Sequence, residues 1–118
     1  MAIPQWNATQ TGNQAEHKAK EYLIAQGLDF IEQNFSVKSG EIDLIFKDMQ
    51  QWVFVEVKYR ASSSHGHAAE MFTSSKRSKL TKAIMCYLQL LDLNCHHTNM
   101  RIDLVAIDGE ELNWIKNV

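Results

Sequence analysis

Three acidic residues and one lysine interrupt two short apolar segments in the middle of the chain. Asp43 follows Glu41 by two residues, and Lys58 follows Glu56 by two residues. Residues two apart on a β-strand share a face, so each pair would present its charges to one side of a sheet. A charged group on a largely buried sheet must be paired or must bind a metal ion. The spacing therefore points to a chemical site where two strands lie side by side.

The two apolar segments are Ile42–Phe46 and Trp52–Val57, and a short polar linker connects them. Both segments are rich in β-branched and aromatic residues, which predicts a β-hairpin. Strand alternation also predicts that Ile42 and Leu44 share one face of the first strand, opposite Asp43.

Such an arrangement suits the hydrolysis of phosphodiesters. Mg²⁺ takes oxygen ligands, usually one or two carboxylates, and leaves coordination positions for water and phosphate. Asp43 and Glu56 are the candidate carboxylate ligands, with the main-chain carbonyl of Val57 as a third. Lys58 would contact the attacking water or the scissile phosphate. On the pattern alone, a cross-strand ion pair on a solvated face is the more frequent explanation of such residues.

The segments Gly40–Ile45 (GEIDLI) and Phe54–Arg60 (FVEVKYR) together resemble the D-x(n)-E-x-K core of the restriction-endonuclease-like, or PD-(D/E)xK, superfamily. More narrowly, the chain is similar to the small bacterial YraN family from about Gly12 to Trp114. The superfamily proline is absent, because Ile42 precedes the motif aspartate. The resemblance implies an endonuclease that uses Mg²⁺ or Mn²⁺ to cleave DNA, structured or branched DNA included. Members of the superfamily can lose catalysis and keep the fold, so a catalytically silent nucleic-acid-binding module is the alternative. A small structural or protein-interaction domain is a third interpretation.

Two further carboxylates have open roles. Glu16 matches the helix-one glutamate of the resembled family, which implies a catalytic place at the metal edge of the sheet. The alternative is a solvated pair with Lys20, one helical turn later. For Asp103 a structural hydrogen bond is expected rather than metal binding. The sequence His65-Gly66-His67 is expected to be solvated rather than metal-binding.

Positive charge is concentrated just after the proposed site. Residues 58–82 contain six basic residues and one acid, although the whole chain has a net charge of −2. Arg60, Lys76, Arg77 and Lys79 are the candidates for contacts with nucleic acid. The last three fall in the first turns of a predicted helix, where cations oppose the helix dipole and a bound anion would be favourable.

The remaining chain supplies the framework of an α/β fold. Apolar periodicity predicts the order αβββαββ, a mixed sheet flanked by helices, and this agrees with the restriction-endonuclease-like core αβββαβ that the resemblance implies. Residues 1–12 are expected to be a frayed lead-in, residues 61–73 a flexible loop near the active face, and Asn34 a cap for the turn before Gly40. Besides the hairpin, the predicted elements are a helix over Asn13–Gln26 ended by Gly27, a strand over Phe30–Val37, a helix capped by Ser74 or Ser75 that runs to about Leu91, and strands over Arg101–Ile107 and Leu112–Ile115. Helical spacing predicts that the packing face of the first helix is Ala15, Ala19, Tyr22, Leu23 and Gln26, and that the apolar stripe of the second is Leu80, Ala83, Ile84, Tyr87, Leu88 and Leu91.

Composition bounds the class of protein. The 118 residues suit one domain, and 45% hydrophobic residues are ordinary for a globular protein. No apolar run reaches the roughly 20 residues that span a bilayer, and the N-terminus lacks the pattern of a signal peptide. We therefore expect a cytoplasmic protein that does not contact membranes. Cys86 and Cys95 are expected to be reduced thiols. The oligomeric state is open, with a homodimer as one alternative.

Overall fold

The computed structural model describes residues 8–62, 64 and 66–118 of the chain. The predicted α/β class and the order of two long helices and five strands are confirmed. The elements are α1 (Ala8–Ala25), β1 (Asp29–Val37), β2 (Gly40–Asp48), β3 (Gln51–Arg60), the 3₁₀ helix η1 (Ala68–Met71), α2 (Ser74–Leu90), β4 (Met100–Asp108) and β5 (Glu111–Ile115).

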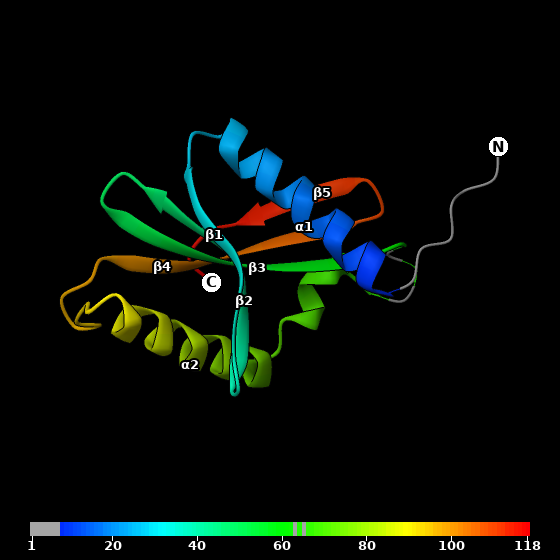
Figure 1. Ribbon diagram of the computed structural model, residues 1–118. Coiled ribbons are helices and arrows are strands. Elements are labelled where there is room, and N and C mark those ends of the chain that lie inside the picture. The colour runs from blue at the N-terminus through cyan, green and yellow to red at the C-terminus, as the bar shows by residue number, and fades with distance from the viewer. Residues whose placement is uncertain (1–7, 63, 65) are drawn as a thin grey trace.

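The strands form one mixed sheet in the order β1-β2-β3-β4-β5, with α1 on one side and α2 on the other (Figure 1). Neighbouring strands are antiparallel except β3 and β4, which are parallel. A parallel pair needs a crossover connection, and α2 lies in that connection. The predicted mixed sheet flanked by helices is confirmed.

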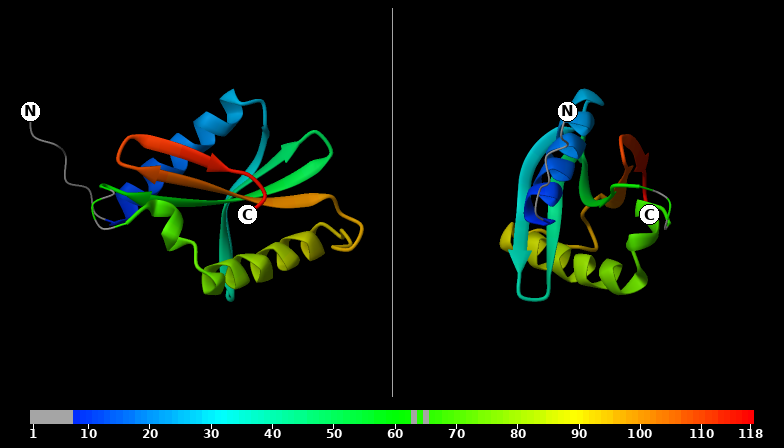
Figure 2. Two further views of the ribbon diagram at one scale, coloured as in Figure 1. Left: turned by 180° about the vertical axis from the view of Figure 1, so that it is seen from behind. Right: turned by 90° about the vertical axis from the view of Figure 1, so that its right-hand side faces the viewer.

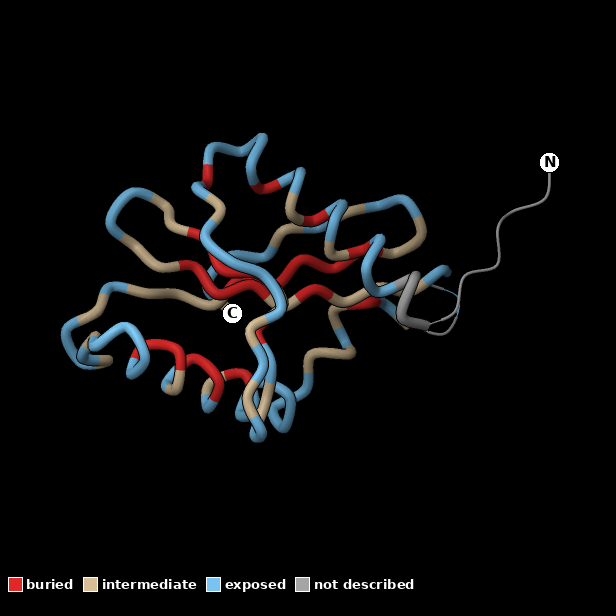
Figure 3. The backbone as a smooth tube through the Cα atoms, viewed as in Figure 1, coloured by how far each residue is buried: buried red, intermediate tan, exposed pale blue. Residues whose placement is uncertain are grey.

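The described residues form two large apolar cores, one on each side of the sheet, and a small cluster of Ala68, Leu104 and Ala106. Figure 3 shows in red the buried segments of both helices and of the central strands. Ala15, Ala19 and Leu23 of α1 are buried on one side, as the helical periodicity predicted, whereas Tyr22 and Gln26, predicted for the same face, are exposed. The apolar stripe of α2 is buried on the other side, whereas Leu91, predicted to belong to it, follows the helix and is 43% exposed. Gly27 ends α1 with a positive φ of 98°, as predicted for a helix C-terminus.

Strand β2 changes the face to which its apolar side chains point. Ile42 belongs to the core under α2, whereas Leu44 and Phe46 belong to the core under α1. The prediction that Ile42 and Leu44 share one face is therefore wrong. The β1–β2 hairpin twists strongly and runs from beside α1 to beside α2 (Figure 2), so strict alternation fails along it. Asp43 lies at the change of face.

Gly40 lies against the second turn of α2. A Cβ atom on Gly40 would overlap the main-chain carbonyl of Lys79. Any larger residue would therefore push the start of β2 away from the helix. The glycine allows this close approach and sets α2 beside the acidic segment of β2.

Both helices begin earlier than predicted. Helix α1 begins at Ala8, so residues 8–12 are helical rather than part of a lead-in, and residues 1–7 lie outside the described residues. Thr, Gly and Asn are frequent in these first turns and have low helix propensity, so the sequence did not predict a helix before Asn13. The N-cap of α2 is Thr73, not Ser74 or Ser75, because its side chain accepts a hydrogen bond from the N–H of Lys76 at 3.3 Å.

The second half of the predicted flexible loop over residues 61–73 is ordered around η1. Ala68 is fully buried, and its N–H donates a 2.7 Å hydrogen bond to the carboxylate of Asp108 at the end of β4. This anchor holds η1 beside β3 and β4. Residues 63 and 65 lie outside the described residues.

Neither long helix has the run of apolar residues that would let it cross a lipid bilayer, considering the described part of the chain.

Candidate active site

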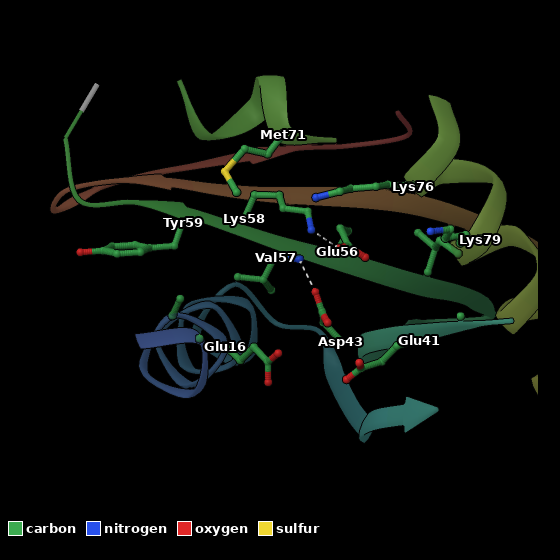
Figure 4. Close-up of a pocket in the computed structure, with 14 residues that line it drawn as sticks. Glu16, Glu41, Asp43, Glu56, Val57, Lys58, Tyr59, Met71, Lys76 and Lys79 are labelled. Carbon is green, nitrogen blue, oxygen red and sulfur yellow. Dashed lines mark hydrogen bonds and ion pairs between the residues drawn. The ribbon is translucent and has the colours of Figure 1, made fainter. Parts of the chain in front are cut away.

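An open pocket of about 700 Å³ lies where β2 and β3 separate, between α1 and the start of α2 (Figure 4). It contains every residue predicted to form the catalytic centre. The lining residues are Gly12, Ala15 and Glu16 of α1; Gly40, Glu41 and Asp43 of β2; Glu56, Val57, Lys58 and Tyr59 of β3; Met71 of η1; and Lys76, Lys79 and Leu80 of α2.

The side chain of Asp43 takes the place of a backbone pair between β2 and β3. The register of these strands ends with Leu44 opposite Val55. One residue further, the carboxylate of Asp43 accepts a 2.8 Å hydrogen bond from the main-chain N–H of Val57. The bond satisfies a donor that the departing strand leaves unpaired. It also fixes the carboxylate between the two strands.

The same geometry directs the carbonyl of Val57, the third candidate ligand, toward the pocket. The N–H and C=O of one strand residue point to the same side of the strand. Since the N–H of Val57 points to Asp43, its carbonyl oxygen faces the same gap.

The environment of Asp43 opposes its negative charge. Burial, and next the charge of Glu56, raise the pKa of Asp43 to about 8. The hydrogen bond from Val57 acts in the opposite direction, but it does not offset these causes. The negative charge of Glu56 thus favours a protonated Asp43, and a cation bound between the two carboxylates would reverse this preference.

Glu56 and Lys58 form an ion pair on the face of β3 that turns toward α2. The distance from Lys58 Nζ to Glu56 Oε1 is 2.8 Å, and the two side chains are 16% and 12% exposed, respectively. Strand alternation placed them on one face, as predicted, and Figure 4 shows both beside Asp43. An ammonium group has three donors, so this contact leaves Lys58 two more for a phosphate or a water.

Glu16 lies in the pocket rather than in a pair with Lys20. The ammonium group of Lys20 donates to Gln33 and lies over the ring of Phe30. Burial, followed by the charge of Glu41, raises the pKa of Glu16. Of the two predicted roles, the place at the acidic edge of the sheet is the one that agrees with this position.

Asn34 is a residue near the site that the sequence pattern did not identify. It lies inside β1 with φ of 55°, between two residues that pair with Leu44 and Ile42, and hence opposite Asp43. Burial and the charge of Glu41 raise the pKa of Glu16, and the nearby side chain of Asn34 acts in the opposite direction. It does not cap the turn before Gly40, because β1 continues to Val37. The usable signal was an asparagine within a predicted strand, because asparagine adopts a positive φ more readily than most residues other than glycine.

Two of the four predicted nucleic-acid contacts lie at the pocket. Lys76 and Lys79 line it from α2, three residues apart and hence on one helix face. Arg77 points elsewhere and donates to the main-chain oxygen of Val118. Arg60 does not line the pocket, and its Nε is buried without a hydrogen-bond partner among the described residues.

Asp103 has a structural environment, as expected. It is fully buried away from the pocket and accepts hydrogen bonds from Arg101, from Trp114 Nε1 and from the N–H of Asn117. These donors satisfy both carboxylate oxygens and tie β4 to the chain after β5.

His67 also lies away from the pocket, with its Nδ1 3.7 Å from a carboxylate oxygen of Asp108, whereas His65 lies outside the described residues. Across residues 8–62, 64 and 66–118, no three His, Cys, Asp or Glu side chains are grouped closely enough to hold a metal ion. The candidate donor set is therefore the carboxylates of Asp43 and Glu56 with the carbonyl of Val57. Both cysteines are free thiols, as predicted.

Comparisons with known proteins cover nearly the whole chain. A model of the uncharacterised protein family UPF0102 matches residues 15–107. A UPF0102 protein of Vibrio vulnificus strain YJ016 is 55% identical over 108 residues, which cover 90% of this chain and 88% of that protein. A UPF0102 protein of Aliivibrio salmonicida strain LFI1238 is 49% identical over 108 residues, covering 90% and 88%. One of Vibrio cholerae strain ATCC 39315 is 42% identical over 113 residues, covering 94% and 93%. Except for Gly12, every residue that lines the pocket falls within the matched range.

Proposed function

The chain belongs to the uncharacterised protein family UPF0102, the YraN family expected from its motifs, and we propose that it is a metal-dependent endonuclease. The reaction is the hydrolysis of a phosphodiester bond in nucleic acid, with DNA as the expected substrate. Asp43, Glu56 and Lys58 form the catalytic centre, and Glu16 adds a carboxylate at its edge.

One observation carries the proposal. Two carboxylates from adjacent strands share a pocket with three lysines, although the charge of Glu56 disfavours ionisation of Asp43. A binding surface for phosphate has no use for paired anions, because they repel the ligand. A site that holds a divalent cation between the acids and the phosphate uses both kinds of charge.

The donor set fits Mg²⁺ or Mn²⁺. Magnesium is commonly held by only one or two carboxylates together with water and substrate phosphate oxygens, so Asp43 and Glu56 suffice without a third acidic side chain. The oxygen of Val57 adds a neutral ligand of the same kind. When bound, such an ion lowers the pKa of water and offsets charge that develops on the phosphate.

The chain's own residues supply position and charge. The hydrogen bond from Val57 holds the Asp43 carboxylate in place before any ligand enters. Lys58, held by Glu56 on the floor of the pocket, donates to a phosphate oxygen as negative charge grows there. In hydrolysis the water oxygen bonds to phosphorus and gives up a proton, the bond to the leaving oxygen breaks, and that oxygen gains a proton. Lys76 and Lys79 hold the phosphates that flank the reacting one.

The Glu56–Lys58 contact favours a second candidate, a catalytically silent nucleic-acid-binding module. A short ion pair between mostly buried groups satisfies Glu56 without any metal ion. The two candidates make opposite predictions for metal binding and for cleavage.

The test is a cleavage assay with single-stranded, duplex and branched DNA and with RNA, each in Mg²⁺, Mn²⁺ or EDTA. The matched variant is Asp43→Asn, which keeps the side-chain oxygen that accepts the hydrogen bond from Val57. We expect metal-dependent cleavage by the wild type and none above background by the variant. Calorimetry with Mn²⁺ should show binding that the double variant Asp43→Asn, Glu56→Gln loses. Equal Mn²⁺ binding by the wild type and the double variant would mean that Asp43 and Glu56 are not metal ligands. Absence of cleavage on every substrate would favour the catalytically silent nucleic-acid-binding module.

A further inference from the structure

The pocket offers little unpaired positive charge for a site that must hold a polyanion. Lys58 is paired with Glu56, whereas Lys76 and Lys79 have no partner among the described residues. These two lysines can hold about two phosphates. Most other basic side chains are engaged locally: Lys18 with the carbonyl of Glu110, Lys20 with Gln33, Lys47 over Trp52, Arg77 with Val118, Arg101 with Asp48 and Asp103, and Lys116 over Trp114.

This charge distribution suits a single strand better than a duplex. Proteins that bind duplex DNA often neutralise about 6–10 phosphates, and the chain has a net charge of −2. The reacting groups also lie at the bottom of the pocket, where the Glu56 side chain is only 12% exposed. A backbone must enter the pocket to reach them, which is easier for a strand that has no partner.

An aromatic side chain lies at the other end of the pocket. Tyr59 follows Val57 by two residues on β3 and lines the pocket at the end away from Lys79 (Figure 4). Its ring is partly buried against the core under α1 and partly exposed. Among the described residues the α1 wall of the pocket is open, because a Cβ atom on Gly12 would meet none of their atoms within 4 Å. A base therefore has both an aromatic surface and space at this pocket.

We propose that the pocket binds single-stranded nucleic acid, with about two phosphates at Lys76 and Lys79 and one base stacked on Tyr59. The inference rests on the proposed function for the position of the reacting phosphate, at Asp43 and Glu56 between these two ends. Stacking on an aromatic side chain is tolerant of base identity, so little sequence preference is expected.

The experiment measures the affinity of a short labelled oligothymidylate and of its duplex with oligoadenylate, by fluorescence anisotropy in EDTA and in Mg²⁺. The variants are Tyr59→Leu, which removes the aromatic ring, and Tyr59→Phe, which keeps it as the matched control. We expect the single strand to bind more tightly than the duplex. Tyr59→Leu should weaken binding of the single strand roughly 5- to 160-fold, the range for loss of one stacked base. Tyr59→Phe should leave the affinity nearly unchanged, and thermal unfolding should show that both variants fold.

Tighter binding of the duplex, or equal affinity of folded Tyr59→Leu and Tyr59→Phe, overturns the inference. Cleavage of duplex without preference for single strands overturns it too, and leaves the endonuclease proposal standing. Conversely, single-strand binding that depends on Tyr59, with no cleavage in Mg²⁺ or Mn²⁺, supports this inference and overturns the catalytic proposal.

Discussion

The carboxylate of Asp43 accepts the main-chain N–H of Val57 at 2.8 Å, one residue beyond the point where the pairing of β2 and β3 ends. A side chain thus takes over the role of a backbone acceptor while the strands separate. The gap that opens beside this bond is the pocket.

The first prediction concerns the pH dependence of stability without metal. The pKa of Asp43 is about 8 in the folded protein, and an unfolded aspartate has a pKa of about 3.9. The folded state therefore holds a proton that the unfolded state releases. The stability that this proton contributes is present below about pH 4 and is lost as the pH rises through about 8. The wild type in EDTA should lose stability across this window relative to Asp43→Asn.

Chemical denaturation at several pH values, with tryptophan fluorescence, would measure this difference. Asp92→Asn is the matched control, because Asp92 is exposed and its positive φ of 57° also suits asparagine. Parallel curves for the wild type and Asp43→Asn would mean that Asp43 is ionised in the folded protein at neutral pH.

The second prediction separates catalysis from binding at Lys58. Lys58→Met keeps the aliphatic stem and should lower the single-turnover rate by about 10²–10³, the range for loss of one electrostatic contact in the transition state. The affinity for nucleic acid should fall much less, since Lys76 and Lys79 remain. A rate and an affinity that fall by the same factor would make Lys58 a contact of the bound substrate only.

The same variant should destabilise the protein, because Glu56 is left mostly buried and unpaired. Removal of one partner of a buried ion pair typically costs about 3–5 kcal/mol. The double variant Glu56→Gln, Lys58→Met should recover most of this free energy of unfolding. Rates are therefore compared at a temperature at which Lys58→Met is folded.

The third prediction concerns the salt dependence of binding. Lys76→Glu together with Lys79→Glu should weaken binding of a single strand and flatten its salt dependence. Two phosphate contacts correspond to a slope of about −1.4 in log affinity against log salt concentration. Lys82→Glu is the control for a single charge reversal, half the charge change of the double variant, because Lys82 is exposed on α2 but does not line the pocket. An equal change of slope in the control would point to general charge rather than to the pocket.

The fourth prediction uses two glycines. Gly40→Ala should destabilise the protein by about 1–3 kcal/mol, because the added methyl group overlaps the carbonyl of Lys79 and cannot be accommodated without movement of α2. Gly12→Ala should be neutral or stabilising by up to about 1 kcal/mol, since its methyl group meets no atom of the described residues within 4 Å and alanine favours the helix. Thermal and denaturant unfolding compare the two; a stable Gly40→Ala would show that β2 and α2 can separate at little cost.

Much of the fold could be predicted because local patterns determine it. The helical spacing of apolar residues located the buried faces of α1 and α2, and the β-branched runs located β2 and β3. Strand alternation brought Glu56 and Lys58 to one face. That face turns toward α2, so spacing along β3 predicted that these two side chains lie together.

The parts that could not be predicted depend on shape beyond the local pattern. The change of face at Asp43 follows from the twist of the β1–β2 hairpin, and alternation assumes a flat strand. The positive φ of Asn34 follows from the tertiary course of β1. By contrast, the separation of Arg77 from the two pocket lysines was within reach, since residues three apart share a helix face and adjacent residues do not.

The order of the strands has a consequence for how the protein folds. β1, β2 and β3 follow one another in the chain and in the sheet, so their pairing closes only short loops. Asp43 and Glu56 both lie in this meander of β1, β2 and β3, which we expect to form early. Lys76 and Lys79 lie on α2, which takes its place only when β4 pairs in parallel with β3, a slower step. Of the three lysines that line the pocket, Lys58 lies on the same strand as Glu56. We therefore expect its charge to limit repulsion between the two acids while the chain is still assembling, before any substrate is present.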